Sequence, residues 1–288
     1  MTIVNAICGR LARLSLSTLL AGLAILPLQA ATFYQIKVPG SITTSALGIN
    51  SANQIVGYYA SSQGGFQGFV LSNNKFTTVN YPHAANTLLS AINDTGVILG
   101  YYDDGFLIHG FTLINGTYTS FDYPGGTNTY AFGINNTGQI VGNYSGPDGR
   151  VHGFELNGDT FTTIDVPNST STEAYGINGA GDVCGTYTPS NGNEPQGFLL
   201  RNGVFQTISY PNALNTTATG INSKDQIVGQ YVPSSLSNTG YAFANGKFLS
   251  VQYPGSKTTS LSGINSADVV VGNWSDSQNN YSGFAAKP

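Results

Sequence analysis

Residues 133–142 read Gly-Ile-Asn-Asn-Thr-Gly-Gln-Ile-Val-Gly, and this stretch decides the fold. Its β-branched runs flank a turn rich in Asn and Gly, a pattern typical of a tight β-hairpin. The opening tripeptide recurs with spacings of 43, 42, 43, 44 and 43 residues. The six copies are Gly48-Ile49-Asn50, Ala91-Ile92-Asn93, Gly133-Ile134-Asn135, Gly176-Ile177-Asn178, Gly220-Ile221-Asn222 and Gly263-Ile264-Asn265. Internal repeats of this length indicate a propeller or a solenoid.

A second marker keeps the same period. An aromatic residue or Val precedes Pro at Val38-Pro39, Tyr81-Pro82, Tyr123-Pro124, Val166-Pro167, Tyr210-Pro211 and Tyr253-Pro254. Each unit of about 43 residues contains four short β runs separated by turn residues, which is the size of a propeller blade. The units extend over residues 31–288, and we expect a single domain there with no linker.

The two ends of the repeat region complement each other. Residues 33–39 match the fourth strand of a unit, with no first three strands before them. Residues 263–284 supply three strands with no fourth. Joined, the two segments complete one blade and close a ring, whereas the alternative, a stacked β-solenoid, has no use for complementary ends. The sequence therefore predicts an all-β fold: a six-bladed β-propeller closed by its N-terminal strand.

Charged residues are scarce. The 288 residues include 10 basic and 14 acidic ones, or 8% of the chain, and 37 glycines. Soluble proteins average about 25% charged residues and about 7% glycine. The 40% hydrophobic content argues against disorder. A net charge of −4 disfavours nucleic acid as a partner.

Residues 1–30 have the order of regions found in secretory signal peptides. Arg10 and Arg13 precede an apolar run, and small residues follow at Ala30 and Ala31. We expect cleavage near Ala30 and a secreted, extracellular or periplasmic protein. An N-terminal membrane anchor is the alternative, but the apolar run is short and interrupted, so we expect no stable anchor.

Cysteine usage agrees with a fold held by its core. Cys8 lies in the expected signal segment, which leaves Cys184 without a disulfide partner. Other units have Val or Leu in the Cys184 position, so we expect a small buried hydrophobic side chain and not a nucleophile.

The third strand of each unit begins with a tripeptide whose last residue is Phe. The tripeptides are Gln67-Gly68-Phe69, His109-Gly110-Phe111, His152-Gly153-Phe154, Gln196-Gly197-Phe198, Tyr241-Ala242-Phe243 and Ser282-Gly283-Phe284. Together with Gly-Ile-Asn-x-x-Gly-Gln-Ile-Val-Gly, they resemble the HAF repeat of bacterial exported proteins, named after His-Ala-Phe at this place. Here Gly mostly replaces Ala, and His remains in two units. The resemblance covers essentially all of residues 31–288 and implies export and a propeller-like fold, but no catalytic activity.

Metal and cofactor sites find little support. His109 and His152 share one blade position, and we expect imidazoles that are buried with a hydrogen-bond partner; a metal would require both to point at one place. The turn after Gly-Ile-Asn resembles calcium-binding turns, but calcium needs several carboxylates. Each turn offers at most one, namely Asp94, Asp182, Asp225 or Asp268. We therefore expect neither a metal nor a cofactor.

Catalytic motifs are missing from the sequence. It contains no Gly-x-Ser-x-Gly, no His-Glu-x-x-His, no phosphate loop and no dinucleotide fingerprint. Asp122 and Asp165 occupy a variable position of the fourth strand and are expected to be solvated. We predict no catalytic residues.

The units differ in length mainly between the second and third strands. From the second-strand aromatic residue to the third-strand Phe the separations are 10, 9, 10, 11, 12 and 10, and the fifth unit shortens its next turn by two residues. This loop lies on the same side of an antiparallel blade as the loop that joins successive units. We call that side the loop face and the opposite side the turn face. Asp103 and Asp104 lie in such a loop of the second unit.

A Thr recurs in all six loops that join units, and it is expected to anchor a turn through its hydroxyl. These residues are Thr44, Thr87, Thr129, Thr172, Thr216 and Thr259. The following position varies, and it holds Tyr130 and Glu173 in the third and fourth units. If the first strand is innermost, these two stand side by side near the channel mouth. We predict binding residues Tyr130, Glu173, Asp103 and Asp104.

The near-regular units favour a secreted, monomeric, non-catalytic module that binds a carbohydrate or a protein on the loop face. One alternative is a hydrolase or lyase acting on extracellular polysaccharide, with Glu173 and a loop Asp as the acid–base pair. The other is a structural or surface-display protein.

Overall fold

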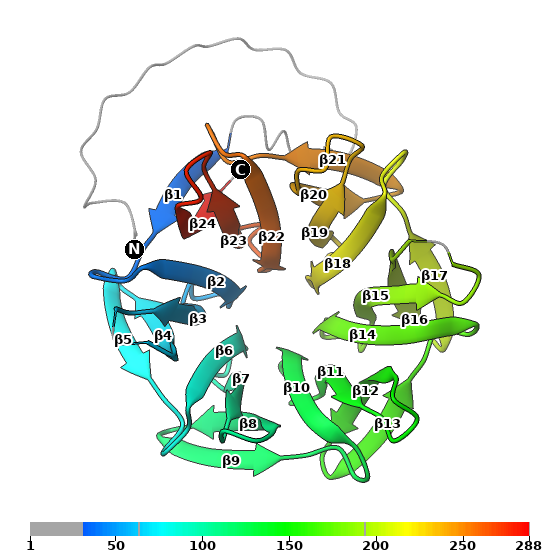
Figure 1. The fold of residues 1–288 in the computed structure, drawn as a ribbon, viewed down its shortest axis with the longest axis horizontal. Helices are drawn as coiled ribbons and strands as arrows, with labels where there is room; N and C mark the ends of the chain where they lie inside the picture. Colours follow the sequence, from blue (N-terminus) through cyan, green and yellow to red (C-terminus); the bar gives the residue numbers. More distant parts are fainter. Residues whose placement is uncertain (1–30, 63, 193, 288) are drawn as a thin grey trace.

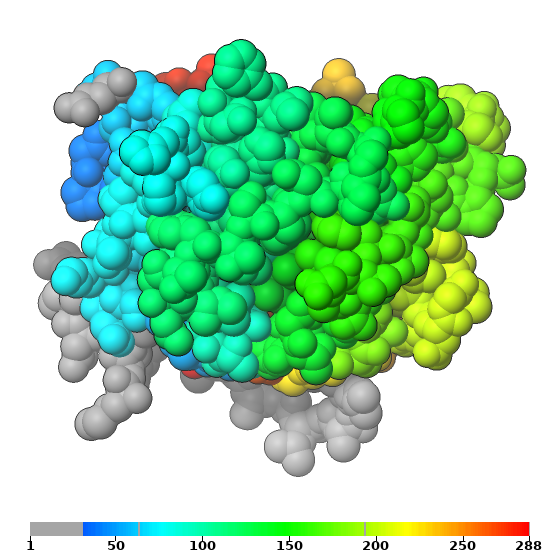
Figure 2. All heavy atoms as spheres, turned by 90° about the horizontal axis from the view of Figure 1, so that it is seen from below, coloured from blue at the N-terminus to red at the C-terminus, as the bar shows by residue number. Residues whose placement is uncertain are grey.

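In the computed structural model, residues 31–62, 64–192 and 194–287 are described, and they form six antiparallel sheets of four strands arranged as a ring (Figure 1). In each sheet the first strand lines the central channel and the later strands follow outward. The edge of the ring shows the blades in sequence order, from cyan to yellow (Figure 2). The predicted six-bladed propeller is confirmed.

In blades 1 to 5 the strands follow chain order from the channel outward, and in blade 6 the N-terminal strand comes last. Blade 1 has β2 (Thr43–Ile49), β3 (Ile55–Ala60), β4 (Phe66–Ser72) and β5 (Lys75–Val79); blade 2 has β6 (Asn86–Ile92), β7 (Ile98–Asp103), β8 (Ile108–Ile114) and β9 (Thr117–Phe121). Blade 3 has β10 (Thr127–Ile134), β11 (Ile140–Ser145), β12 (Val151–Asn157) and β13 (Thr160–Ile164); blade 4 has β14 (Ser169–Ile177), β15 (Val183–Pro189), β16 (Gln196–Arg201) and β17 (Val204–Ile208). Blade 5 has β18 (Asn215–Ile221), β19 (Ile227–Val232), β20 (Thr239–Ala244) and β21 (Lys247–Val251); blade 6 has β22 (Thr258–Ile264), β23 (Val270–Ser275), β24 (Tyr281–Lys287) and β1 (Thr32–Ile36).

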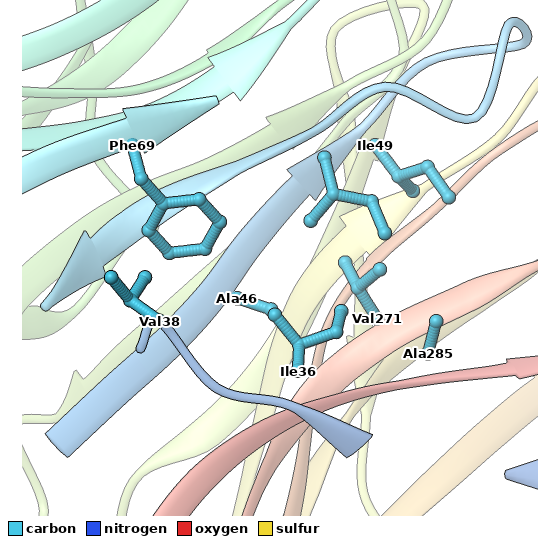
Figure 3. Close-up of a cluster of buried hydrophobic side chains, with 8 residues drawn as sticks. Ile36, Val38, Ala46, Ile49, Phe69, Val271 and Ala285 are labelled. Atoms are coloured by element: carbon cyan, nitrogen blue, oxygen red, sulfur yellow. The ribbon is translucent and has the colours of Figure 1, made fainter. Parts of the chain in front are cut away.

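The N-terminal strand closes the ring. β1 pairs with β24 in a register that runs from Thr32 opposite Lys287 to Ile36 opposite Gly283. Ile36 and Val38 are buried against side chains of blades 1 and 6, in a cluster that includes Ala46, Phe69, Val271 and Ala285 (Figure 3). The predicted joining of the two ends is thus confirmed, and apolar burial at the seam stabilises it.

Two expectations concern the N-terminal segment. Residues 1–30, the expected signal peptide, lie outside the described residues. Over the part of the chain that is described, no helix is both long enough and apolar enough to cross a membrane.

The turn after each Gly-Ile-Asn is organised by the Asn side chain. Asn135 Oδ1 accepts the N–H groups of Thr137 and Gln139 at 3.1 and 3.0 Å. Gly138 takes the positive φ of the turn, +86°. Asn53 takes the equivalent positive φ in blade 1, +58°, whereas Asn135 instead caps the turn with its side chain.

The same Asn residues link neighbouring blades on the turn face. Asn50 Nδ2 donates to the carbonyl oxygen of Asn93 at 3.2 Å, and Asn265 Nδ2 donates across the seam to the carbonyl of Asn50 at 3.0 Å. Asn93, Asn135 and Asn222 repeat the bond to the next blade. Asn178 departs from the pattern and donates to the Asp225 carboxylate at 3.2 Å. We call these six residues the asparagine ring.

Blades also pack through a repeated apolar contact, in which a second-strand Val or Leu meets the third-strand aromatic ring of the next blade. Val141, for example, shares a buried cluster with Phe198. Cys184 takes the Val position and shares a cluster with Tyr241. Burial raises the pKa of the Cys184 thiol to about 12, which agrees with an unreactive core side chain.

The register corrects one alignment made from the sequence. Tyr241 lies opposite Gly229, as Phe69 lies opposite Gly57, so Tyr241 and not Phe243 is the fifth equivalent of the third-strand Phe. The separation from the second-strand aromatic residue is then 10, and the fifth blade has no shortened turn. The alignment made from the sequence chose Phe243 because it is also aromatic and lies two residues after Tyr241.

Candidate ligand-binding site at the channel mouth

A β-bulge shapes the first strand of each blade where it lines the channel. In blade 3 the β10–β11 register shifts between Ala131 and Gly133. A Cβ added to Gly142 would lie only 2.0 Å from the Tyr130 carbonyl oxygen, and one added to Gly185 would lie equally close to the Glu173 carbonyl. Only glycine permits this approach, so the recurring second-strand Gly fixes the bulge beside Tyr130 and Glu173.

One first-strand side chain from each blade borders the channel cavity: Leu47, Ser90, Phe132, Tyr175, Thr219 and Ser262. The first-strand residue two positions earlier lies nearer the loop face and is paired across the ladder with a second-strand residue, so these side chains lie next to one another. We call this set the upper wall. By blade, from 1 to 6, it comprises Ser45, Leu47 and Tyr58; Leu88, Ser90 and Tyr101; Tyr130, Phe132 and Asn143; Glu173, Tyr175 and Thr186; Thr217, Thr219 and Gln230; Ser260, Ser262 and Asn273.

Aromatic rings dominate one side of the upper wall. The centroids of Tyr101 and Tyr130 are 5.2 Å apart, and those of Phe132 and Tyr175 are 5.0 Å apart. Tyr101 also contacts Phe132, at 5.8 Å. The four rings thus form a continuous aromatic surface across blades 2, 3 and 4.

The opposite side of the wall is polar and small. Blade 5 contributes Thr217 and Thr219, and blade 6 contributes Ser260 and Ser262. The channel mouth therefore has an aromatic half and a hydroxyl-bearing half, with a mixed blade 1 between them.

Glu173 lies at the border between blades 3 and 4. Its Oε2 accepts hydrogen bonds from the Tyr175 hydroxyl and from Asn143 Nδ2, the latter at 3.3 Å. Asn143 is the ladder partner of Tyr130, so it stands between Tyr130 and Glu173. The structure places the two predicted residues on neighbouring first strands of the upper wall, with an amide between them.

The phenols near Glu173 stay neutral at physiological pH. Burial, reinforced by the adjacent Glu173 carboxylate, raises the pKa of Tyr175 well above its usual value. Burial and the neighbouring phenols of Tyr58 and Tyr130 likewise raise the pKa of Tyr101. Neither ring can therefore supply a charge beside Glu173.

Thr186 lies opposite Glu173 in the β14–β15 ladder. The residue is 8% exposed, and its Oγ1 is buried without a hydrogen-bond partner. Leaving such an atom unsatisfied is costly for the folded protein.

The side chains of Asp103 and Asp104 form their hydrogen bonds around the loop between β7 and β8, and none of these bonds is with Glu173. Asp103 accepts from Asn86 Nδ2 at 3.0 Å and from the Gly105 N–H at 2.7 Å. Asp104 accepts the N–H groups of Phe106 and Leu107 at 2.8 and 2.9 Å. Both carboxylates therefore order this loop.

Each of the two histidines lies between two carboxylates. His109 Nδ1 is 2.9 Å from Asp122 and its Nε2 is 3.3 Å from Asp104. His152 repeats the arrangement with Asp165 at 2.9 Å and Asp148 at 3.0 Å. Asp122 and Asp165 are solvated as expected, with side chains 53% and 37% exposed, and each in addition contacts a histidine. The sequence did not predict that contact, because it does not show that the end of the fourth strand faces the third-strand imidazole.

The six recurrent threonines do anchor turns. Each hydroxyl accepts the N–H of the residue before Pro at 2.9–3.0 Å, as Thr129 does from Tyr123. They lie in the first strands and not in the loops themselves.

The Asn-containing turns use their polar groups within the protein. The capping Asn oxygens accept backbone N–H groups, and the acids have partners: Asp182 and Asp225 both contact Arg201, at 2.8 and 3.0 Å. Asp268 pairs with Lys224 at 2.9 Å. Within residues 31–287, apart from positions 63 and 193, no three His, Cys, Asp or Glu side chains are arranged to hold a metal ion.

Two cavities lie along the channel below the upper wall. A cavity of about 90 Å³ is bordered at its upper end by Phe132, Tyr175 and Ser262. A second cavity of about 170 Å³ lies between the six Ile residues of the Gly-Ile-Asn repeats and the asparagine ring. The Ile and Asn positions that line this second cavity are the same in all six blades, whereas the upper-wall positions differ.

Fold and site together define a six-bladed β-propeller with an asymmetric channel mouth. TolB from Acinetobacter baumannii is similar, with a TM-score of 0.57 and 11% identity; the match covers 85% of this chain and only 63% of TolB. A protein provisionally assigned as a gluconolactonase gives a TM-score of 0.53 at 11% identity, over 90% and 92% of the two chains. The fucose-specific lectin from Aleuria aurantia gives 0.46 at 13% identity, over 72% and 76%.

These likenesses concern the fold alone, because the identities are so low. No family model matches the sequence. No curated protein matches it either.

The sequence predicted that Tyr130 and Glu173 lie on successive blades, but it did not predict the residues around them. Tyr175 lies two residues after Glu173 on the same strand, and Asn143 and Thr186 are ladder partners of the two predicted residues. A comparison of the repeats at these two further positions, which also vary among units, would have identified them.

Proposed function

We propose that the protein is a non-catalytic binding module that takes a sugar ring at the upper wall, from the loop face. The observation that carries this proposal is the division of the wall into an aromatic half and a hydroxyl-bearing half. The C–H face of a sugar packs on aromatic rings such as Tyr130, while its hydroxyls exchange hydrogen bonds with Thr, Ser and amide side chains.

The carboxylate inventory supports binding without catalysis. Glycoside hydrolysis usually needs two carboxyl groups flanking the bond that breaks. Glu173 is the single carboxylate of the upper wall, and Asp103 and Asp104 hold their own loop together. A hydrolase would therefore lack the second group at this site.

A protein ligand is the second candidate, and exposed apolar side chains on the loop face favour it. Phe106 is 92% exposed, Leu236 is 73% exposed and Ile42 is 62% exposed. All three lie in loops of that face. Apolar side chains on one face can mark an interaction surface.

A combined glycan and peptide array probed with residues 31–288 tests the proposal. We expect glycan binding that Tyr130→Leu weakens at least about tenfold, because the substitution removes an aromatic platform. Tyr34→Leu is the matched control, since Tyr34 is 40% exposed on the outermost strand β1. Peptide binding that Tyr130→Leu leaves unchanged would favour the second candidate, and turnover of glycosidic substrates abolished by Glu173→Gln would make the protein a hydrolase or lyase.

We further propose that the chain is a HAF-repeat protein exported as a monomer, without a nucleic-acid partner or a stable membrane anchor. The support is the sequence of residues 1–30 and of the repeats. A periplasmic reporter enzyme fused after Ala31 tests export: activity should be lost when Arg10, Arg13 and the apolar run are replaced. Activity that survives their replacement would contradict the signal-peptide assignment.

A further inference from the structure

Glu173 is an uncompensated negative charge in an aromatic setting. It is the only charged residue of the upper wall. Its hydrogen-bond donors are the neutral Tyr175 hydroxyl and Asn143 amide, both to Oε2. No Lys, Arg or His among the described residues forms an ion pair with it.

The rings beside Glu173 add to the preference for a cation. Tyr175 and Phe132 are in contact at 5.0 Å, and Tyr130 lies parallel to Phe132 at 6.1 Å. Aromatic faces attract ammonium groups through their quadrupoles, more strongly when water is excluded. A carboxylate next to such faces is a recognised way to hold a protonated amine in proteins.

The residue opposite Glu173 in the ladder brings no compensating charge, because it is the neutral and buried Thr186. An ammonium group on a ligand would supply the positive charge that the carboxylate lacks within the described residues. We infer that the sugar bound at the upper wall carries a protonated amine that pairs with Glu173, so that the ligand class is an amino sugar.

This inference rests on the proposed function, and a matched pair of ligands separates the two. The probes are the β-1,4-linked tetramer of glucosamine and its N-acetylated counterpart, which differ in charge, titrated calorimetrically at about pH 6 into residues 31–288. We expect the free-amine tetramer to bind at least about tenfold more tightly, and Glu173→Gln to reduce that ratio to about one. Glu194→Gln, an equal charge change in an exposed loop of the same blade, should leave the ratio unchanged.

The outcomes distinguish the amine inference from the proposal of sugar binding. Equal affinity for the two tetramers overturns the amine inference and leaves sugar binding intact, whereas no binding to either tetramer or to any glycan overturns both. If Glu173→Gln does not fold, salt provides a second measurement. Raising it from about 20 mM to about 500 mM should weaken the free-amine tetramer and spare the acetylated one, and an equal response would contradict the charge pair.

Discussion

The two ends of the channel obey different rules. At the turn face, six equivalent asparagines make nearly the same bonds, and the last one reaches back to Asn50 across the seam. At the loop face, the equivalent positions hold Ser45, Leu88, Tyr130, Glu173, Thr217 and Ser260, no more than two alike. What repeats in this molecule holds the ring together, and what varies is free to recognise something.

The largest effect is expected from opening the ring, which would disturb the channel at both the loop face and the turn face. Deleting residues 31–39 removes β1 together with buried Ile36 and Val38, which opens blade 6. We expect a loss of several kcal/mol, about that of two or more core truncations, and loss of a cooperative melt. Calorimetry measures it, and Ile42→Ala, at a residue 62% exposed, is the control. An unchanged melting temperature after the deletion would refute closure by β1.

A second prediction separates the two ends. Asn265→Ala removes the cap of one turn and the bond across the seam, so we expect about 2 kcal/mol of destabilisation. Glu173→Gln, at the loop face, should change stability by less than about 0.5 kcal/mol. Urea denaturation of the two variants checks this. Equal destabilisation would show that the irregular end is structural after all.

A third prediction concerns the buried contact between Cys184 and Tyr241, where both residues differ from those at the equivalent positions of the other blades. The third-strand ring that packs against the preceding blade is Phe in five blades and Tyr241 in blade 5. The Tyr241 hydroxyl is buried without a hydrogen-bond partner. Tyr241→Phe should stabilise by about 1 kcal/mol. Cys184→Val should cost about 1–3 kcal/mol by crowding the hydroxyl, and much less beside Tyr241→Phe. Additive effects in this double-mutant cycle would mean that Cys184 does not accommodate Tyr241.

The smallest expected effect is pH dependence from the two histidines. Burial lowers the pKa of His109, but hydrogen bonds and charge from Asp122 and Asp104 outweigh it and raise the pKa. His152 behaves likewise beside Asp148 and Asp165. A raised folded-state pKa means a stabilising contribution that is complete below about pH 6.5, the unfolded value, and is lost as pH rises through the folded value.

The matched variant for this test comes from the chain itself, since blades 1 and 4 have Gln67 and Gln196 at this position. Replacing both histidines by Gln should remove about 1–2 °C of the fall in melting temperature between about pH 6 and pH 9. Parallel pH profiles for the two proteins would contradict the contribution.

The sequence predicted the fold almost completely because the period and the turn residues repeat six times, and because the two ends of the repeat region each supply the strands that the other lacks. It predicted Tyr130 and Glu173 because they interrupt a repeat. It did not predict Asn143 or Thr186, whose roles depend on which residues face each other across a ladder. It also misaligned Tyr241, since a second aromatic residue two positions later satisfied the same pattern.

Closure by β1 has a consequence for how the protein is made. Thr32 pairs with Lys287, so β1 cannot find its partner until β24 has been synthesised. The ring therefore cannot close, and blade 6 cannot be completed, before residues 281–287 have been made. Pairing over so long a separation also slows folding. Until β24 is available, the edge of β1 stays unpaired and the ring stays open.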